Sequence, residues 1–440
     1  MVAVADVTAP FRSGRGPALV ALLILGAALL AAIVAATPWR TLPPVPGGST
    51  AVSAARDFGP AEIAREEAFH AALRPLSYAS LVLGLAVAAV LGLTPLGARL
   101  VAAVARPLGG GWVWQVVLGG VAVMLVGWLL ALPLSARREA VLRSYGLSTQ
   151  NWPGWWVDRA KGLAVSAVLL LVVLLVLYGL IRLFPRGWWA TAAASVALLV
   201  ILTSFVYPLL VEPVFNKFTP MADGPLRTSL LQLAERDGVP VRDVLVADAS
   251  RRTSTLNAYV SGFGATRRIV VYDTTVERAS QDEIRLIVAH ELGHAERNDV
   301  LRGTLVAALG LGAGVVLLYL LLTWTPLLRR AGIDSGGDPR SLALVLLLVT
   351  VMGTLAGPAQ QLVSRRVEAR ADVHALDLTE QPVVFARMQR RLALANLSDL
   401  DPGPLVYGLF ASHPTTPQRI GLARDWARLH GEPPPPPMRP

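Results

Sequence analysis

The sequence predicts a mainly α-helical membrane protein with seven transmembrane helices and a small α+β lobe at one membrane face. The first observation is composition: the 440-residue chain is 54% hydrophobic and 16% charged, and its mean hydropathy is +0.53. This is too apolar for a soluble protein. The second is that seven apolar stretches have the length of about 20 residues that a helix needs to cross a bilayer. The third is that two polar regions, residues 213–302 and 363–430, lie outside these stretches.

The seven expected spans fall into two groups, five within residues 17–212 and two within residues 303–362. They are residues 17–37, 75–97, 112–134, 162–184, 188–211, 303–325 and 341–362. Tryptophans stand at several span ends, where amphipathic rings prefer the membrane interface. They are Trp112, Trp114, Trp188, Trp189 and Trp324. Their positions support the span boundaries.

The two ends of the chain carry little pattern. Residues 1–16 and the proline-rich residues 431–440 are expected to be disordered. The first span could instead be a cleaved signal peptide, because Arg12 and Arg15 precede it and small residues end it. Its apolar run is longer than the usual core of a signal peptide, so we expect a retained span.

The polar region 213–302 predicts mixed secondary structure. Residues 244–247 and 268–272 have the composition of short strands, whereas residues 280–298 have helical character. We therefore expect a small α+β lobe at the membrane surface.

One pentapeptide in this region points to a metal site. His290, Glu291 and His294 belong to the sequence HELGH, and on a helix the two histidines lie one turn apart on the same face, where they can hold a single ion. Glu291 is then placed to hold a water molecule beside the ion. The chain has no cysteine, which excludes thiolate ligands and cysteine nucleophiles. One zinc ion per chain is the leading hypothesis.

A catalytic zinc ion takes three protein ligands, so HELGH needs another donor. One zincin class continues the motif with a glycine and a third histidine, but Arg297 and Val300 stand at those positions and exclude it. Glu368 is the best candidate, because it begins a Glu-x-x-x-Asp segment that puts Asp372 one turn later on the same helix face. Asp372 could then hydrogen-bond the outer nitrogen of a ligating histidine.

The number of spans between the two motifs allows a shared site. HELGH and Glu368 are separated by spans six and seven, and an even number of spans returns the chain to the same side of the membrane. The loops after spans one, three and five and the C-terminal region hold most basic residues, so this side is expected to be cytoplasmic. The same arginine-rich loops account for the net charge of +10. No basic stripe interleaved with aromatic residues predicts a nucleic-acid partner.

Several motifs together resemble the type I CAAX prenyl endopeptidase family, the a-factor-converting metalloproteases. The likeness begins with HELGH and the Glu368 segment and extends over nearly the whole chain, since family-like stretches also flank the spans. These stretches are Ser364-Arg365 with Ala371-Asp372, Asn257-Ala258-Tyr259, Ser412-His413-Pro414 with Arg419-Ile420, residues 145–150 and residues 213–220.

The resemblance implies a role for each residue that matches a family motif. Zinc would be bound by His290, His294 and Glu368, with Glu291 as general base and Asp372 supporting the site. The seven helices would form a barrel that encloses a large, water-filled chamber.

The resemblance also implies residues that handle the substrate. His413 and Arg419 would assist the substrate carbonyl or the oxyanion. Asn257, Ala258 and Tyr259 would lie on an edge strand that holds the substrate backbone by strand addition.

The substrate remains open between two classes of peptide or protein. The family implies a prenylated CAAX C-terminus, whereas the arginine-rich composition suggests a bacterial plasma membrane, where such substrates are not expected. Broad quality-control cleavage of membrane proteins is the alternative. In either case membrane lipid surrounds the chain, and the sequence leaves its oligomeric state open.

Two other functional classes fit the sequence less well. A seven-helix transporter or receptor would place ionisable groups deep inside its spans, but the seven central stretches hold no acidic residue. A pseudoenzyme that keeps the metal for structure alone would not need Glu291.

Overall fold

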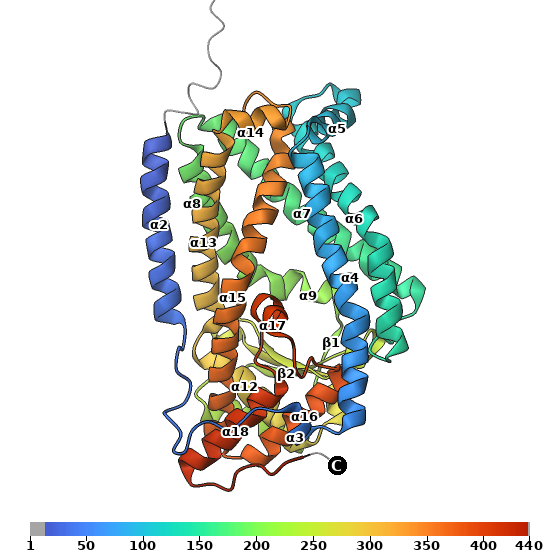
Figure 1. The fold of residues 1–440 in the computed structure, drawn as a ribbon, viewed down its shortest axis with the longest axis vertical. Helices are drawn as coiled ribbons and strands as arrows, with labels where there is room; N and C mark the ends of the chain where they lie inside the picture. The colour runs from blue at the N-terminus through green and yellow to red at the C-terminus, as the bar shows by residue number, and fades with distance from the viewer. Residues whose placement is uncertain (1–13, 439–440) are drawn as a thin grey trace, which may run out of the picture.

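The computed structural model describes residues 14–438. The molecule is elongated, with long helices at one end and a mixed lobe at the other (Figure 1). Within the described residues, seven helices are long and apolar enough to cross a membrane. The expected number of spans is confirmed, and the chain is a multi-pass membrane protein.

The long helices run past the expected span ends in several places. They are α2 (Arg15–Ala36), α4 (Pro60–Gly92), α6 (Trp112–Ser144), α7 (Trp152–Leu183), α8 (Trp188–Leu210), α13 (Asp299–Leu322) and α15 (Leu342–Thr379). The second expected span is wrong at its end, because α4 stops at Gly92 and a separate helix, α5 (Pro95–Ala105), follows. Thr94 and Pro95 favour a new start here, because Thr94 caps α5 and the ring and missing N–H of Pro95 suit the first turn of a helix.

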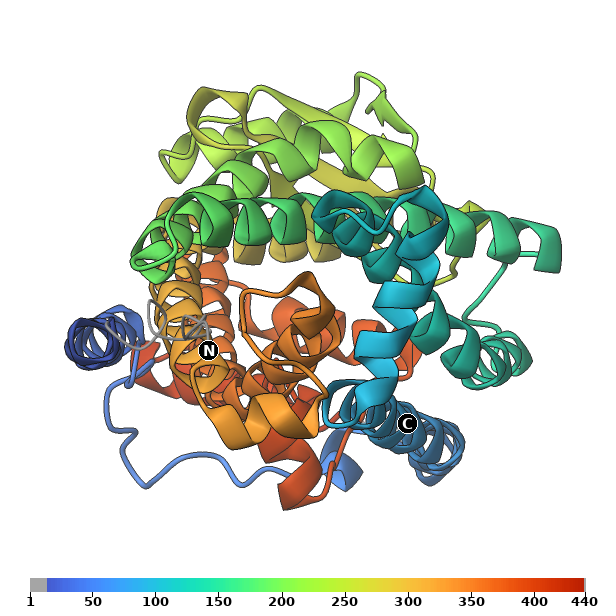
Figure 2. The same ribbon diagram turned by 90° about the horizontal axis from the view of Figure 1, so that it is seen from above.

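Six of the seven long helices close a ring, so the barrel that the resemblance implied is present but excludes one helix. Neighbours around it are α4, α6, α7, α8, α13 and α15, and α15 packs back on α4. The helix α2 lies outside the ring against α13, which Figure 2 shows from above. A cavity of about 610 Å³ lies between α4, α6, α7 and α15.

The lobe combines a four-stranded sheet with helices on its face. The strands are β1 (Phe218–Pro220), β2 (Asp243–Ala247), β3 (Ala258–Ser261) and β4 (Arg268–Tyr272), in the spatial order β1-β2-β4-β3. β2 and β4 pair in parallel, and the two outer pairs are antiparallel. The two strands expected from the sequence are therefore confirmed, and β3 is an edge strand.

The helices of the lobe come from both polar regions of the chain. They are α9 (Glu212–Phe215), α10 (Pro225–Arg236), α11 (Asp273–Arg278), α12 (Gln281–Glu296), α16 (Pro382–Asn396), α17 (Pro404–Phe410) and α18 (Thr416–His430). The short helices α3 (Ala54–Asp57) and α14 (Thr325–Arg330) lie in connections. The helix expected at residues 280–298 is confirmed as α12.

One helix, α15, links the membrane core to the lobe core. Its 38 residues span roughly 57 Å at about 1.5 Å per residue. Leu342 and Leu347 near its start pack in the core of the ring, whereas Ala375 and Leu376 near its end pack with α12, α16 and α18. The rigid helix therefore carries the Glu368 segment from the membrane to the face of α12.

The chain ends differ from the expectation of disorder. Residues 1–13 lie outside the described residues, but α2 already begins at Arg15, whose guanidinium donates hydrogen bonds to Thr323 Oγ1 and to its carbonyl, both at 2.8 Å. Residues 431–438 are held against α18, because the buried Arg424 donates to the carbonyls of Pro435 and Pro436 at 2.9 and 3.0 Å. The proline-rich composition of this segment predicted disorder because it gives no sign that Arg424 binds the segment.

Candidate active site

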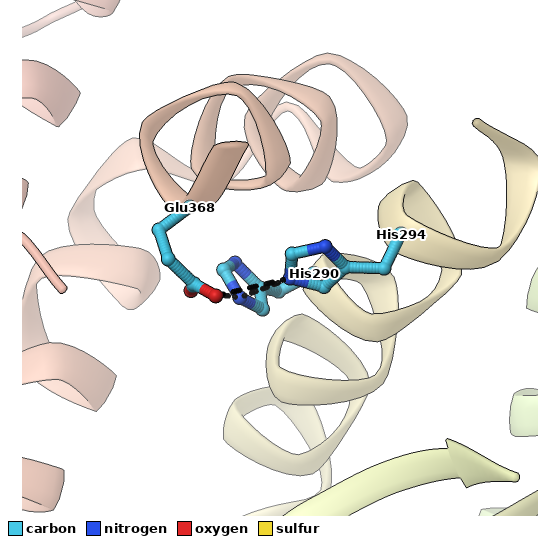
Figure 3. Close-up of side chains that lie close together, drawn as sticks. All are labelled: His290, His294 and Glu368. Carbon is cyan, nitrogen blue, oxygen red and sulfur yellow. Dashed lines mark hydrogen bonds and ion pairs between the residues drawn. The ribbon is translucent and has the colours of Figure 1, made fainter. Parts of the chain in front are cut away.

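The helix α12 presents both histidines of HELGH to α15. α12 packs between the edge strand β3 and α15, and its buried apolar residues face the sheet and the lobe core. Ser280 caps the helix and so sets where it begins. Figure 3 shows His290 and His294 projecting from α12 towards Glu368, which projects from α15.

The two histidines and Glu368 bring their donor atoms to one point. His290 Nε2 lies 3.3 Å from His294 Nε2 and 3.2 Å from Glu368 Oε2. His294 Nε2 lies 3.6 Å from Glu368 Oε1. Ligand atoms that sit about 2.0–2.2 Å from a tetrahedral zinc ion are roughly 3.3–3.6 Å apart. The three residues therefore fit a metal ion without rearrangement.

Asp372 holds His290 from its outer side. Its Oδ1 lies 3.0 Å from His290 Nδ1, and the fully buried carboxylate is paired with Arg419, whose Nε donates to Oδ2 at 2.8 Å. Burial by itself lowers the pKa of His290, but the hydrogen bonds with Asp372 and Glu368 outweigh burial and raise it to about 9. The arrangement fixes the ring so that Nε2 faces the metal position.

Asp299 holds the outer nitrogen of His294 as Asp372 holds that of His290. The sequence analysis did not predict this role for Asp299. Asp299 Oδ2 lies 2.9 Å from His294 Nδ1, and Arg370 from α15 pairs with the Asp299 carboxylate. Asn298 has a positive φ of 53°, so the chain reverses after α12 and turns Asp299 back towards His294. In the sequence, Asp299 is visible only as a carboxylate five residues after His294. That spacing does not predict a contact unless the turn at Asn298 is known.

Glu291 stands beside the donor atoms and is not one of the three. It lines the same cavity as His290 and Arg419. Enclosure in the site raises the pKa of the Glu291 carboxyl above its usual range, although the imidazoles of His290 and His294 oppose this effect. A carboxylate of raised pKa is a better proton acceptor than an exposed one.

His413 and Arg419 approach the site from the C-terminal region. His413 Nε2 lies 3.3 Å from Glu368 Oε2, and its side chain is 56% exposed, so it can reach a ligand in the cavity. Ser412 Oγ lies 2.8 Å from His413 Nδ1. Arg419 is both a cavity residue and the ion-pair partner of Asp372.

The edge strand β3 leaves backbone groups unpaired beside α12. Tyr272 N donates to the carbonyl of Asn257, and Ala258, Tyr259 and Ser261 follow in antiparallel register with β4. Because hydrogen-bonded pairs alternate in such a ladder, the N–H and C=O groups of Ala258 and Val260 point away from β4; Ala258 is buried there and Val260 is half-buried. Asn257 precedes the strand and lines the cavity instead.

A second group of residues of metal-ligand type lies between α4 and the loop after α16, and contacts within the protein account for it. Glu66, His70 and Asp399 come close together, but His70 Nε2 hydrogen-bonds the Leu397 carbonyl at 2.8 Å and Arg74 pairs with Asp399 at 2.6 Å. This network fastens α4 to the loop after α16. The cationic Arg74 disfavours a metal ion there.

Two family descriptions cover most of the chain. Residues 57–217 match the "CAAX prenyl protease N-terminal, five membrane helices" domain, and residues 220–427 match "Peptidase family M48". The boundary between the two matches falls where α9 ends and the sheet begins.

Individual relatives agree with these matches. The metalloprotease YhfN of Bacillus subtilis is 33% identical over 67% of this chain and 70% of its own length. The CAAX prenyl protease 1 homolog of rice, Oryza sativa, is 30% identical over 69% of this chain and 72% of its own. The crystal structure of Ste24p from S. mikatae shares the fold, with a TM-score of 0.76, 23% identity, and coverage of 93% of this chain and 97% of that chain.

The site described above lies within the M48 match, and the helix ring begins in the CAAX prenyl protease N-terminal match. The chain therefore belongs to peptidase family M48, in its CAAX prenyl protease branch, and is a multi-pass membrane metalloendopeptidase.

Proposed function

We propose that the protein hydrolyses peptide bonds with a zinc ion held by His290, His294 and Glu368. The observation that carries the proposal is the spacing of the donor groups beside the Glu291 carboxylate in one cavity: the two Nε2 atoms lie 3.3 Å apart, and each lies 3.2 or 3.6 Å from a carboxylate oxygen of Glu368. Two imidazoles and one carboxylate form a donor set typical of catalytic zinc. When bound, zinc would polarise the scissile carbonyl and make a water molecule more acidic.

Glu291 acts as the general base in this proposal. Its carboxylate takes a proton from the attacking water and passes it to the leaving amine. The raised pKa of Glu291 supports this role, since the carboxylate must hold the proton between the two transfers. His413 donates a hydrogen bond to the developing oxyanion, a contribution commonly worth about 3 kcal/mol. Arg419 keeps Asp372 ionised and thereby holds His290 in place.

The edge strand positions the substrate. The N–H and C=O groups of Ala258 and Val260 face away from β4, and they can pair with an extended substrate backbone and bring its carbonyl to the metal when the substrate displaces what covers the buried Ala258. Asn257 stands at the cavity wall and can hydrogen-bond the same backbone.

The proposed substrate is a membrane-attached protein cut near a lipidated, CAAX-like C-terminus. The name of the rice relative supports this class. Broad quality-control cleavage is the other outcome that the experiment below distinguishes. We also propose that the lobe faces the cytoplasm of a bacterial cell, on the distribution of basic loops.

The test uses purified protein, its metal content and two peptides of one sequence, farnesylated and unmodified. We expect about one zinc per chain and cleavage that Glu291→Gln reduces by several orders of magnitude while zinc stays bound. Glu296→Gln is the matched control, because Glu296 lies on the same helix and pairs with the exposed Arg297. Full activity of Glu291→Gln would refute the mechanism, and equal cleavage of both peptides would favour the quality-control function.

A further inference from the structure

We propose that the helix ring binds a long-chain fatty carboxylate, a single-chain amphiphile with an anionic head group, in the cavity between α4, α6, α7 and α15 (Figure 1). The head group pairs with Arg159, and the chain lies between the helices. The cavity has a volume of about 610 Å³, which is within the range of small-molecule sites. Among the described residues, its lining has no member in common with the lining of the cavity at the metal site.

Arg159 is a cation without an anionic partner at this cavity. Its Nε is buried and has no hydrogen-bond partner in the part of the chain that the structure describes. The contacts of its guanidinium are with aromatic rings, since its central carbon lies 6.0 Å from the ring centroid of Trp128 and 5.8 Å from that of Trp155. An anion in the cavity would therefore gain charge-assisted hydrogen bonds that Arg159 lacks within the protein.

The acidic neighbour of Arg159 has partners of its own. Asp158 also lines the cavity, but it accepts a hydrogen bond from Gln150 Nε2 at 2.6 Å, and its carboxylate lies 3.9 Å from Arg252 Nη1. Arg252 does not line the cavity. The charge of Asp158 is thus balanced from outside, and Arg159 is the charge that a ligand in the cavity can neutralise.

Arg159 lies at the depth of the lipid head groups. The expected apolar span of α7 begins at residue 162, just beyond Arg159. Trp152 and Trp156, which precede Arg159 on the same helix, are 42% and 46% exposed, as is typical of rings at a membrane interface. A ligand whose head group pairs with Arg159 therefore lies like a lipid of the leaflet on the side of the lobe.

The rest of the lining fits one apolar chain. The wall contains Leu83, Val87, Met124, Leu163, Leu170 and Leu346. Three helices also turn a glycine to the cavity, Gly84, Gly127 and Gly162, and a Cβ atom at any of them would meet open space. At about 30 Å³ for each non-hydrogen atom, which is the share of a molecule in liquid water, the cavity holds roughly 20 such atoms. That is the size of one fatty acid and less than half that of a phospholipid with two acyl chains.

The experiment measures the binding of radiolabelled palmitate to the purified full-length protein in an uncharged detergent. We expect one saturable site per chain. Arg159→Gln should weaken binding at least about tenfold, because the carboxylate loses its charged hydrogen-bond donors. Arg182→Gln is the matched control and should bind as the parent does, since Arg182 is also on α7 and over a tryptophan ring, that of Trp112, but does not line the cavity.

Filling the cavity tests the position of the chain. Gly162→Leu and Gly127→Leu each place a side chain in the open space from a different helix, and each should weaken palmitate binding at least about tenfold through the clash with the bound chain. Gly179→Leu is the control, because a Cβ atom at Gly179 of α7 also meets open space but this residue is outside the lining. The two filling variants keep the test available if one of them does not fold.

Competition by unlabelled ligands tests the chemistry of the head group and the number of chains. Palmitate should displace the label at least about tenfold better than hexadecanol, which has the same chain without the charge, and better than phosphatidylglycerol, which has two chains. Equal competition by hexadecanol, or parent affinity in Arg159→Gln, would overturn the anionic head group. Equal competition by phosphatidylglycerol would overturn the single chain.

The glycine variants and a catalytic variant complete the test. Parent affinity in both Gly162→Leu and Gly127→Leu would show that palmitate only partitions into the detergent micelle, and the site would be refuted. Glu291→Gln should bind palmitate as the parent does, because Glu291 is not at this cavity. Failure of the proposed function would therefore leave this inference standing, and the reverse is also true.

Discussion

Each proposed histidine ligand is held at its outer nitrogen by a carboxylate that is itself paired with an arginine. Asp372, paired with Arg419, holds His290. Asp299, paired with Arg370, holds His294. At the scale of single residues, the orientation of the imidazoles therefore depends on charges that do not touch the metal.

Removal of either carboxylate should weaken metal binding. We expect Asp372→Ala and Asp299→Ala each to lower zinc affinity about 10- to 100-fold, because the imidazole loses its fixed orientation. Competition with a chelator of known affinity measures the change. Asp377→Asn is the control, since Asp377 lies on the same helix as Asp372 but accepts from Trp426 Nε1. Unchanged affinity in both alanine variants would contradict the role.

Gly293, the fourth residue of HELGH, is required by packing. A Cβ atom at this position would lie 2.9 Å from two ring atoms of His374 on α15, and His374 pairs with Asp237 at 2.9 Å. We expect Gly293→Ala to destabilise the protein by about 1–3 kcal/mol through this overlap. Thermal unfolding of the detergent-solubilised protein measures it. His374→Ala should remove much of the penalty in the double variant, and strictly additive effects would refute the contact.

At the scale of elements, the start of α12 depends on a reciprocal cap. Ser280 N donates to Glu283 Oε2 at 2.8 Å, and Ser280 Oγ accepts from Glu283 N at 3.3 Å. We expect Ser280→Ala to cost about 1 kcal/mol, seen as a lower melting temperature. Ser280→Asp should restore the cap; a melting temperature equal to the parent in Ser280→Ala would show that α12 is held by packing alone.

The same cap predicts a dependence on pH. Burial acts to raise the pKa of Glu283, but the Ser280 amide and the ion pair with Arg391 outweigh burial and lower the pKa below its usual range. A carboxyl whose folded pKa is lowered contributes stability above its unfolded pKa of about 4.3, and this stability is lost as the pH falls through the folded pKa. Comparison of parent and Glu283→Gln melting curves between neutral and acidic pH isolates it: the variant should lack this part of the acid sensitivity.

At the scale of the whole molecule, the ring and the lobe place both motifs on one side of the membrane. Because the chain has no cysteine, single cysteines can map the orientation with a membrane-impermeant maleimide. We expect Glu235→Cys on the lobe to be protected in intact cells and Arg330→Cys at the other end to be labelled, with permeabilised cells as control for both. The reverse pattern would place the active site outside the cytoplasm.

Features of the fold and the site could be predicted from the sequence where the residues that determine them lie close together along the chain. Apolar length located the seven spans, and the i, i+4 spacing of His290 and His294 pointed to them as the proposed ligand pair. The end of α4 was not readable, because prolines also lie inside α4, α6, α8 and α15 and so do not by themselves mark a helix end. The anchoring of residues 431–438 was not readable because it depends on a distant arginine. Asp299 was missed for a similar reason, since only the turn at Asn298 directs it to His294.

The sequence by itself determined the number of spans and predicted the HELGH donor pair, Glu368 as the best candidate for the third donor and the side of the membrane that they share, because hydropathy, helical period and span parity are local or countable properties. Only the tertiary structure decided that the two imidazoles and the Glu368 carboxylate approach within 3.2 to 3.6 Å of one another, that Asp299 and Arg370 complete the support of the histidines, and that a pocket lies at one end of β3. Those features arise where α12, α15, α16 and the edge strand pack together, and contacts between segments so far apart leave no periodic signal along the chain.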